Sequence, residues 1–355
     1  MSGQFHKLKV STVRDETKHV RTVCFDVPPN LKDTFAWRPG QHLTVRFMLG
    51  GKEERRCFSI SSSPFDGSPL RITVKQTKNG VVSKHVNTGL KVGDEVDVLV
   101  PSGGFCFDPQ ERARRTCYFI AAGSGITPLY SMMKSLLVAE SYSVAHLLYG
   151  NADESSIIFQ GELDELSSAY EDRLNLCHIL SSQSFWSSFS PWRSGRIDAE
   201  SIKAFIAEHP PYAQDAQYYI CGPGTMNQDV RAALMAIDVP ADRIHSESFG
   251  GDSAPVGDEV SGVTAQAQIT LGGDTRDIPV AQGQTLLQAM RDAGMDPPYS
   301  CQAGVCATCK AKLRKGRVHM RSRLALDDGE IEAGDILTCQ SVPLTEDLEV
   351  RFPRQ

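Results

Sequence analysis

The sequence predicts a multidomain protein with an antiparallel β-barrel, an α/β domain built on a parallel sheet, and a small α+β domain that contains clustered cysteines. Three observations predict this arrangement. The N-terminal part consists of short β-branched runs separated by turn residues, and strands then alternate with helices from about Thr116. A stretch of glycine, proline, serine and acid, Gly250–Gly262, precedes the cysteine-containing segment.

At 355 residues, the chain is too long for one ordinary core. We expect domains over residues 1–109, 110–249 and 264–355, with residues 250–263 as a flexible linker. The bulk composition is that of a globular protein with a net charge of -6, which argues against a nucleic-acid binder. The N-terminus "MSGQFHKLKV" lacks the apolar core of a signal peptide, and no run is long enough for a membrane helix. A cytoplasmic location is expected.

The barrel strands are predicted from β-branched runs bounded by turn signals such as "RPGQ", "KNG" and "KVGD". These strands are residues 6–13, 20–27, 42–49, 56–60, 70–76 and 94–100. A short amphipathic helix, Val81–Asn87, interrupts them.

The α/β domain is predicted from apolar strands that alternate with helical segments, which is typical of βαβ units. The expected strands are residues 116–123, 144–150, 175–180, 217–222 and 243–249. The expected helices are residues 128–139, 159–170, a segment from Ala199, and residues 225–237. After the linker we expect strands over residues 265–272 and 275–281 and a helix over residues 285–293.

Four cysteines in the last domain have the spacing of metal ligands. Cys301, Cys306 and Cys309 form C-x4-C-x2-C, and Cys339 follows further along the chain. Four thiolates can hold zinc or an iron–sulfur cluster, and unliganded core cysteines are the third alternative. Zinc sites normally use two C-x2-C pairs, whereas this spacing is that of plant-type [2Fe-2S] ferredoxins. The sequence therefore predicts a one-electron [2Fe-2S] centre.

Glycine-rich turns point to nucleotide binding. Gly123 and Gly125 follow a strand and precede a helix, where a pyrophosphate can approach the backbone, although Pro128 departs from the Rossmann fingerprint. Cys221 and Met226 lie in "CGPGTM", after another strand, and this turn could also be a plain β-turn. In "NGVVSKHV", Ser83 lies at a helix start that could bind phosphate, or it could be a plain N-cap.

Taken together, these stretches resemble the ferredoxin–NADP⁺ reductase superfamily. The C-terminal plant-type ferredoxin narrows the resemblance to the reductase subunit of phenylacetyl-CoA epoxidase and to the reductases of Rieske-type oxygenases and 3-ketosteroid hydroxylases. The shared motifs are "RCFS", "GVVS", "GSGITP", "YGN", "CGPGTM", "IHSESF" and "YSCQAGVCATC".

The resemblance implies that the barrel binds FAD. Arg56 would bind the flavin pyrophosphate, Phe58 would pack on the isoalloxazine, and Ser59 would hydrogen-bond near its N5. Phe58 replaces the usual tyrosine, so a hydroxyl contact is lost and the stacking face is kept. The remaining residues implied for FAD are Cys57, Val74, Lys75, Gly80, Val81, Val82 and Ser83.

The resemblance also implies that the α/β domain binds NAD(P)H. The residues implied for the nucleotide are Gly123, Gly125, Thr127, Pro128, Ser181, Arg196, Gly222, Pro223, Met226 and Phe249. Ser59, Cys221 and Glu247 would form the site of hydride transfer, with Phe249 against the flavin.

The expected activity follows from counting electrons. A nicotinamide gives two electrons at once, a [2Fe-2S] cluster accepts one, and a flavin can mediate between them. We therefore expect an oxidoreductase that passes electrons from NAD(P)H through FAD and the cluster to a terminal oxygenase, either a Rieske-type hydroxylase or demethylase or a di-iron monooxygenase like phenylacetyl-CoA epoxidase. The alternative is a redox-sensing regulator. A self-sufficient oxygenase is excluded because the chain has no Rieske C-x-H pair and no di-iron motif.

A basic stretch after Cys309 suggests how this chain and the terminal oxygenase approach one another. Its charges are Lys310, Lys312, Arg314, Lys315, Arg317, Arg321 and Arg323. An acidic stretch precedes Cys339, namely Asp327, Asp328, Glu330, Glu332 and Asp335. One interpretation is a solvated basic hairpin beside an acidic loop. The other is a surface that steers an acidic patch of the oxygenase.

NADH is predicted to be a better donor than NADPH. Ala152, Asp153 and Glu154 follow "YGN", where relatives carry an arginine first, and acids there repel a 2′-phosphate. Ser181 and Arg196 could instead clamp that phosphate. Steady-state kinetics with both nucleotides should give the higher kcat/KM for NADH. A preference for NADPH of about tenfold or more, equivalent to about 1.4 kcal/mol, would contradict the prediction.

Overall fold

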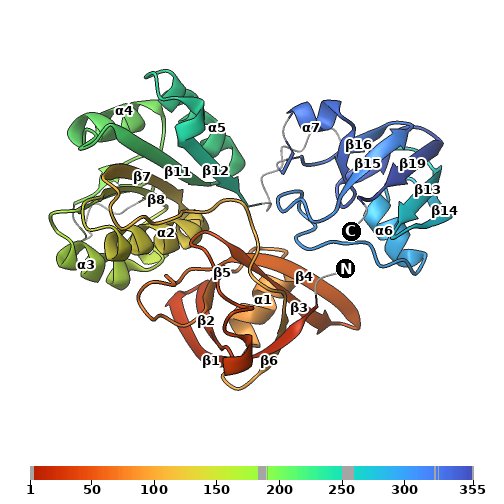
Figure 1. Ribbon diagram of the computed structural model, residues 1–355, viewed down its shortest axis with the longest axis horizontal. Coiled ribbons are helices and arrows are strands. Elements are labelled where there is room, and N and C mark those ends of the chain that lie inside the picture. The colour runs from red at the N-terminus through yellow and green to blue at the C-terminus, as the bar shows by residue number, and fades with distance from the viewer. Residues whose placement is uncertain are drawn as a thin grey trace. The chain divides into compact units, whose positions relative to one another are not determined.

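The computed structural model describes residues 4–182, 189, 191–249, 260–323, 325–326 and 328–353 (Figure 1). The chain divides into two compact units. One comprises Phe5–Glu54 and Phe58–Phe249, and the other comprises Gly250–Gln355 with Met1–Gln4 and Arg55–Cys57. Residues 250–259 of the expected linker lie outside the described residues. The domain limits expected from the sequence remain predictions.

The N-terminal part of the larger unit carries a six-stranded antiparallel sheet with the order β4-β3-β6-β1-β2-β5, in which Arg55–Cys57 of β4 group with the smaller unit. Its strands are β1 (His6–Thr17), β2 (Val20–Asp26), β3 (His42–Leu49), β4 (Lys52–Ser59), β5 (Arg71–Lys75) and β6 (Glu95–Val98). A bridge between Ile60 and Ile72 brings the two end strands together, so the sheet closes on itself. The side chains inside it form one apolar core with helix α1 (Val81–Thr88).

The second part of the larger unit is a parallel sheet with the order β10-β9-β8-β7-β11-β12. Its strands are β7 (Arg115–Ala122), β8 (Val144–Asn151), β9 (Leu174–Leu180), β10 (Arg193–Ser194), β11 (Asp215–Gly222) and β12 (Ile244–Ser248). Its helices are α2 (Ile126–Ala139), α3 (Gln160–Ala169), α4 (Ala199–Glu208) and α5 (Gly224–Met235).

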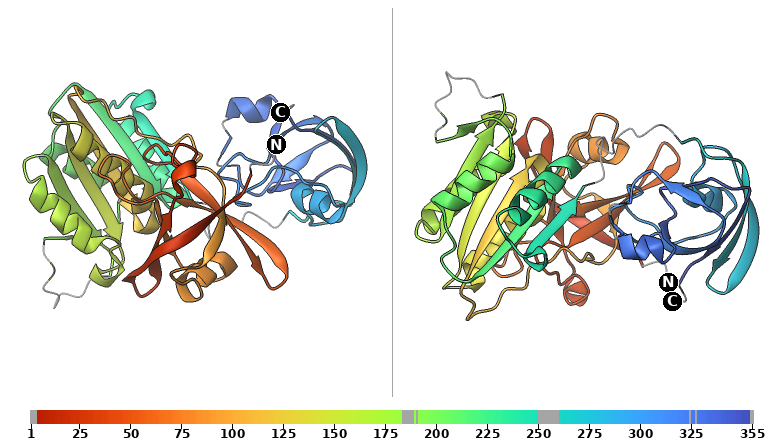
Figure 2. Two further views of the ribbon diagram at one scale, coloured as in Figure 1. Left: turned by 60° about the horizontal axis from the view of Figure 1, so that its bottom comes forward. Right: turned by 90° about the horizontal axis from the view of Figure 1, so that it is seen from above.

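Helices cover both faces of this sheet (Figure 1 and Figure 2). Cys117, Phe119 and Ala121 of β7 pack with α2 and α3, whereas Tyr118 and Ile120 pack with α4 and α5. Successive side chains of a strand point to opposite faces, so each strand contributes to two cores. This explains why these strands are apolar without alternation, as expected of parallel strands buried on both faces.

The smaller unit carries a five-stranded sheet with the order β14-β13-β19-β15-β17 and a two-stranded sheet of β16 and β18. The strands are β13 (Ala265–Leu271), β14 (Asp274–Val280), β15 (Lys310–Lys315), β16 (Val318–Met320), β17 (Asp335–Leu337), β18 (Ser341–Pro343) and β19 (Asp347–Arg351). The helices are α6 (Leu286–Asp292) and α7 (Asp328–Glu332).

Of the two interpretations of the basic stretch after Cys309, the hairpin is wrong. β15 pairs with β17 and β19, and β16 pairs with β18, so the two consecutive strands are not partners. The adjacent acidic segment contains helix α7. Two lysines of the basic stretch pair with acids of the acidic stretch, and a third pairs with an aspartate of β19. Lys310 pairs with Glu330 at 3.0 Å, Lys312 with Asp335 at 2.7 Å, and Lys315 with Asp347 at 3.6 Å.

Most other expected elements are confirmed, with small shifts at their ends. Helix α2 begins at Ile126, two residues before the expected start at Pro128, because a 3-10 turn over Gly123–Gly125 leads directly into it. Proline is tolerated in the first turn of a helix, where its missing N–H has no intrahelical partner. Among the described residues, the helices are all too short or too polar to cross a membrane.

Candidate functional site

Three neighbouring strands bring candidate residues together at the carboxyl edge of the parallel sheet. In the register of β7, β11 and β12, Cys221 lies opposite Ala121 on one side and Glu247 on the other. Ligands of open α/β sheets bind beyond the carboxyl ends of the strands. The expected juxtaposition of Cys221 and Glu247 is therefore present at the edge where a nucleotide would bind.

The loop after β7 depends on glycine. A Cβ on Gly125 would lie 1.9 Å from the carbonyl oxygen of Cys221, so no larger residue fits between the loop and β11. Gly123 has a φ of 52°, and a Cβ there would lie 3.5 Å from Lys75 Nζ. Lys75 and Gly123 are therefore neighbours. The sequence predicts the first for the flavin site and the second for the dinucleotide site.

Thr127 and Pro128 lie in the first turn of α2 and are buried. The Thr127 hydroxyl donates to the carbonyl of Ser124 at 2.9 Å, which holds the glycine turn against the helix. No side chain caps the N-terminus of α2. N–H groups at such a helix start are available to a phosphate.

Cys221 and Glu247 are both in a desolvated environment. Burial, followed by the neighbouring Glu247, raises the pKa of the Cys221 thiol well above its ordinary value. Burial raises the pKa of Glu247 to about 8. At neutral pH the Glu247 carboxyl is therefore mostly protonated, and it can donate as well as accept a hydrogen bond.

Unpaired buried polar atoms also gather at this edge. Among the described residues, four buried side-chain atoms lack a hydrogen-bond partner: Asn151 Nδ2, His178 Nδ1, Asn227 Oδ1 and Glu247 Oε2. Asn151 ends β8, Glu247 is one residue from the end of β12, and His178 is two residues from the end of β9. Buried polar groups without partners are uncommon and call for an explanation, and a polar ligand at the carboxyl edge would supply the missing hydrogen bonds.

Asn227, in the first turn of α5, was not predicted from the sequence. Its Nδ2 donates to the Glu247 carbonyl and to Ser248 Oγ, both at 2.8 Å, which fixes the end of β12 against α5. Its only sequence signal is its place directly after Met226. A Cβ on Gly222 would lie 2.5 Å from Met226 Cε, so the thioether packs directly over that glycine. Pro223 is the N-cap residue of α5, and Phe249 packs on the core beside α2.

The expected flavin residues lie on β4 and at the end of β5. Arg56, Cys57, Phe58 and Ser59 are on β4, and Val74 and Lys75 end β5. The Ile60–Ile72 bridge joins the two ends of the sheet, and the Val74 carbonyl accepts from Asn87 Nδ2 at 3.0 Å. Ser59 and Val74 are buried there, and Phe58 packs on the barrel core.

Helix α1 presents backbone donors at its start. Gly80 is the N-cap and has no capping side chain, so the N–H groups of Val81 and Val82 are available to an anion. Ser83 is the third helical residue, so its interpretation as a plain N-cap is wrong. Its hydroxyl donates to the Gly80 carbonyl at 3.1 Å and accepts from the Thr77 N–H at 3.1 Å.

Residues expected to select the nucleotide also meet at the sheet edge. The Ser181 N–H donates to the Asn151 carbonyl at 3.1 Å, and Arg196 follows the short strand β10, which pairs with β9. Both residues are exposed. The Asp153 carboxylate caps a turn by accepting from the Ser156 N–H at 3.0 Å. Asp153 thus has a structural role in addition to its charge.

The four cysteines with the ferredoxin spacing, Cys301, Cys306, Cys309 and Cys339, lie in two pairs. Hydrogen bonding from Cys301 lowers the pKa of Cys306, and hydrogen bonding from Cys339 lowers the pKa of Cys309. Within the described part of the chain, no three His, Cys, Asp or Glu side chains converge as they would around a single metal ion. Two pairs of thiolates suit two irons, one pair each, better than one tetrahedral zinc.

The loop between these cysteines turns its N–H groups toward the sulfurs. Gln302, Gly304 and Ala307 all have positive φ, at 55°, 76° and 54°. The N–H groups of Ala303 and Val305 donate to the Cys301 sulfur. Curled backbone of this kind forms a nest for an anion and stabilises the negative charge of a thiolate-bound cluster.

Comparison with known proteins agrees with this geometry. Residues 7–107 match the oxidoreductase FAD-binding domain family, residues 119–232 the oxidoreductase NAD-binding domain family, and residues 269–344 the 2Fe-2S iron-sulfur cluster binding domain family. The chain is 36% identical over 351 residues to the E subunit of 1,2-phenylacetyl-CoA epoxidase from Escherichia coli (strain K12), covering 98% of each chain. It belongs to the family of oxygenase reductase components.

Other members of the oxygenase reductase family match over nearly the whole chain. The ferredoxin reductase component of 3-ketosteroid-9-alpha-monooxygenase from Rhodococcus rhodochrous is 36% identical over 355 residues, covering 97% of this chain and 96% of the relative. The solved structure of phthalate dioxygenase reductase has a TM-score of 0.67 and 23% identity and covers 98% of both chains, which shows a shared fold. This oxygenase reductase is therefore an oxidoreductase that uses FAD, a pyridine nucleotide and a [2Fe-2S] cluster.

We predict one FAD and two irons per chain of this reductase. Cys306→Ser should abolish the absorbance of the cluster while NAD(P)H still reduces the flavin, because the cysteine loop and the nucleotide edge belong to different compact units. Cys177→Ser, which removes a half-buried cysteine of β9, is the matched control and should retain both signals. Metal analysis and absorbance spectra provide the measurements, and zinc in place of iron would contradict the prediction.

Proposed function

We propose that this protein is the cytoplasmic reductase component of a multicomponent oxygenase and that it delivers single electrons to a separate terminal oxygenase. The observation that carries the proposal is the full-length match to oxygenase reductase components, covering 98% of this chain and 98% of the Escherichia coli relative. The paired cysteines support the proposal because they suit a one-electron carrier. The polar groups at the carboxyl edge of the parallel sheet support it because they suit a two-electron carrier.

We assign the barrel residues to FAD. Arg56 and the α1 start, from Gly80 to Ser83, would hold the pyrophosphate. Phe58, Val74 and Lys75 would border the ring system, with Cys57 beside them on β4. The support is the match of residues 7–107 to the oxidoreductase FAD-binding domain family and the uncapped start of α1. When bound, FAD supplies the exchange between a two-electron donor and a one-electron acceptor.

We assign Ser59, Cys221 and Glu247 to the site of hydride transfer. The buried Cys221 thiol stays neutral, and Glu247 offers a carboxyl that is mostly protonated at neutral pH. These groups would orient the nicotinamide and exclude water. The assigned nucleotide residues around them are Gly123, Gly125, Thr127, Pro128, Ser181, Arg196, Gly222, Pro223, Met226 and Phe249.

Repeated turnover distinguishes this enzyme from a redox-sensing regulator. The purified protein should oxidise many equivalents of NAD(P)H in the presence of a small artificial electron acceptor. Spectrophotometric assay of NAD(P)H oxidation provides the measurement. Reduction of the flavin and cluster once, with no further consumption of NAD(P)H, would favour the regulator.

We propose that exposed arginines of the smaller unit steer an acidic patch of the oxygenase. The lysines of the basic stretch are already paired with acids, and so they contribute little net charge. Arg314 and Arg317 are exposed at the end of β15 and in the turn that follows. Steering by such charges raises the rate of association more than the affinity and weakens with salt.

Reversal of Arg314 and Arg317 to glutamate should slow electron delivery to the cognate oxygenase at low salt. Reduction of a small neutral acceptor should not change. Arg276→Glu, at an exposed site on β14 of the same unit, controls for a reversal of charge elsewhere on the surface. Equal delivery by the double variant and the wild type at low ionic strength would exclude steering by these arginines.

A further inference from the structure

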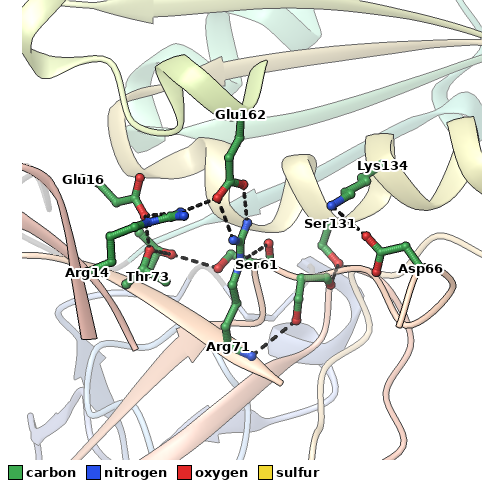
Figure 3. Close-up of polar contacts among 11 residues, drawn as sticks. Arg14, Glu16, Ser61, Asp66, Arg71, Thr73, Ser131, Lys134 and Glu162 are labelled. Carbon is green, nitrogen blue, oxygen red and sulfur yellow. Dashed lines mark hydrogen bonds and ion pairs between the residues drawn. The ribbon is translucent and has the colours of Figure 1, made fainter. Parts of the chain in front are cut away.

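An ion cluster joins the barrel to the α/β domain within the larger unit (Figure 3). Arg71, the first residue of β5, points toward Glu162 in the first turn of α3. Its two terminal nitrogens donate to the two carboxylate oxygens of Glu162 at 2.9 and 2.8 Å. Arg14 of β1 donates to the same carboxylate. A bidentate pair of this kind fixes orientation as well as distance.

The Arg71–Glu162 pair is largely shielded from water. The Arg71 side chain is 12% exposed and that of Glu162 is 21% exposed. Burial alone would raise the pKa of Glu162, but hydrogen bonds from Arg71 and Arg14 hold it at about 2. The carboxylate is therefore ionised throughout the neutral range. Breaking such a pair by removing one partner leaves a buried charge without compensation.

Strand β5 is hydrogen-bonded to α3 at its start and lies close to the dinucleotide loop at its end. At its start, Arg71 Nε also donates to the Ser61 carbonyl at 3.0 Å, and Arg71 packs on the rings of Tyr130 and Phe159. At its end, Lys75 lies beside Gly123 of the dinucleotide loop. Strand β5, which we assign to the flavin site, is therefore held against the α/β domain, which we assign to the nicotinamide.

A second attachment joins the segment after β4 to helix α2. Ser131 Oγ donates to the Ser62 carbonyl at 2.6 Å, and Lys134 pairs with Asp66 at 2.7 Å (Figure 3). Ser63 and Ser135 share a further hydrogen bond of 2.8 Å between their hydroxyls. Helix α2 begins directly after the Gly123–Gly125 turn, and β4 ends at Ser59. The segment that follows β4 is therefore attached to the helix that begins at the dinucleotide loop.

We infer that Arg71 and Glu162 are positioning residues for hydride transfer: they set how closely the nicotinamide approaches the flavin. The inference rests on the proposed function. Hydride transfer needs the reacting atoms in near-contact, and a misplacement of about 1 Å caused by a distant change can cost about 10²-fold in rate. With the bidentate pair lost, β5 would rock against α3 while the binding residues themselves are unchanged.

Anaerobic stopped-flow reduction of the FAD-loaded protein by NADH and NADPH tests the inference. Arg71→Lys keeps the charge and loses the bidentate geometry, and Glu162→Gln keeps the shape and loses the charge. Each should lower the limiting rate of flavin reduction by about tenfold or more, with a smaller change in nucleotide affinity. The long-wavelength absorbance of the stacked nicotinamide and flavin should weaken in parallel.

Arg46→Gln is the matched control. Arg46 is half-buried and pairs with Asp97 at 3.0 Å and with Glu53 at 3.4 Å, both within the barrel. Loss of the Arg46 ion pairs should lower the stability of the protein and leave the limiting rate of flavin reduction unchanged. Wild-type limiting rates in both Arg71→Lys and Glu162→Gln overturn the inference, and so does an equal loss of rate in all three variants. If the wild type shows no flavin reduction by either nucleotide, the proposed function fails first.

Discussion

The close contact between the loop after β7 and strand β11 is the constraint on which the nucleotide edge depends. Gly125 packs against the Cys221 carbonyl at a distance that no side chain allows. The parallel register then sets Cys221 beside Glu247 and directs the start of α2 toward the same edge. Asn227 holds the end of β12 in place from the other side. This backbone contact thus aligns three chain segments that are distant in sequence: the β7–α2 connection, the β11–α5 connection and β12.

Two partly buried carboxyl groups of the larger unit behave in opposite ways because their surroundings differ. Glu162 faces two guanidinium groups and stays ionised, whereas Glu247 has no cation beside it among the described residues and stays mostly protonated at neutral pH. The first carboxylate holds two domains in a fixed relation. The second is a neutral hydrogen-bonding group at the nucleotide edge. Burial is common to both, and the neighbouring charge decides the role.

The sequence was most informative where the signal is local. Alternation of β-branched residues predicts the barrel strands, and the cysteine spacing predicts the cluster ligands, because both patterns lie within a few residues. The last domain was predicted less well. Strands β16, β17 and β18 have only three residues each, too few to show an alternating pattern, and the partners of β15 are distant in the chain. Pairings such as Arg71 with Glu162, or Asn227 with Glu247, leave no local trace, since each residue alone resembles an ordinary surface or helix residue.

The contact between Gly125 and the Cys221 carbonyl also limits how this edge of the sheet can diverge among related proteins. A Cβ at position 125 would lie 1.9 Å from that oxygen, so a larger residue there requires the loop or β11 to shift at the same time. Ser181 and Arg196, in contrast, are exposed at the same edge of the sheet, and replacing their side chains leaves that contact intact. Natural variation at this edge should therefore collect at exposed positions such as these, while position 125 stays closed to gradual change.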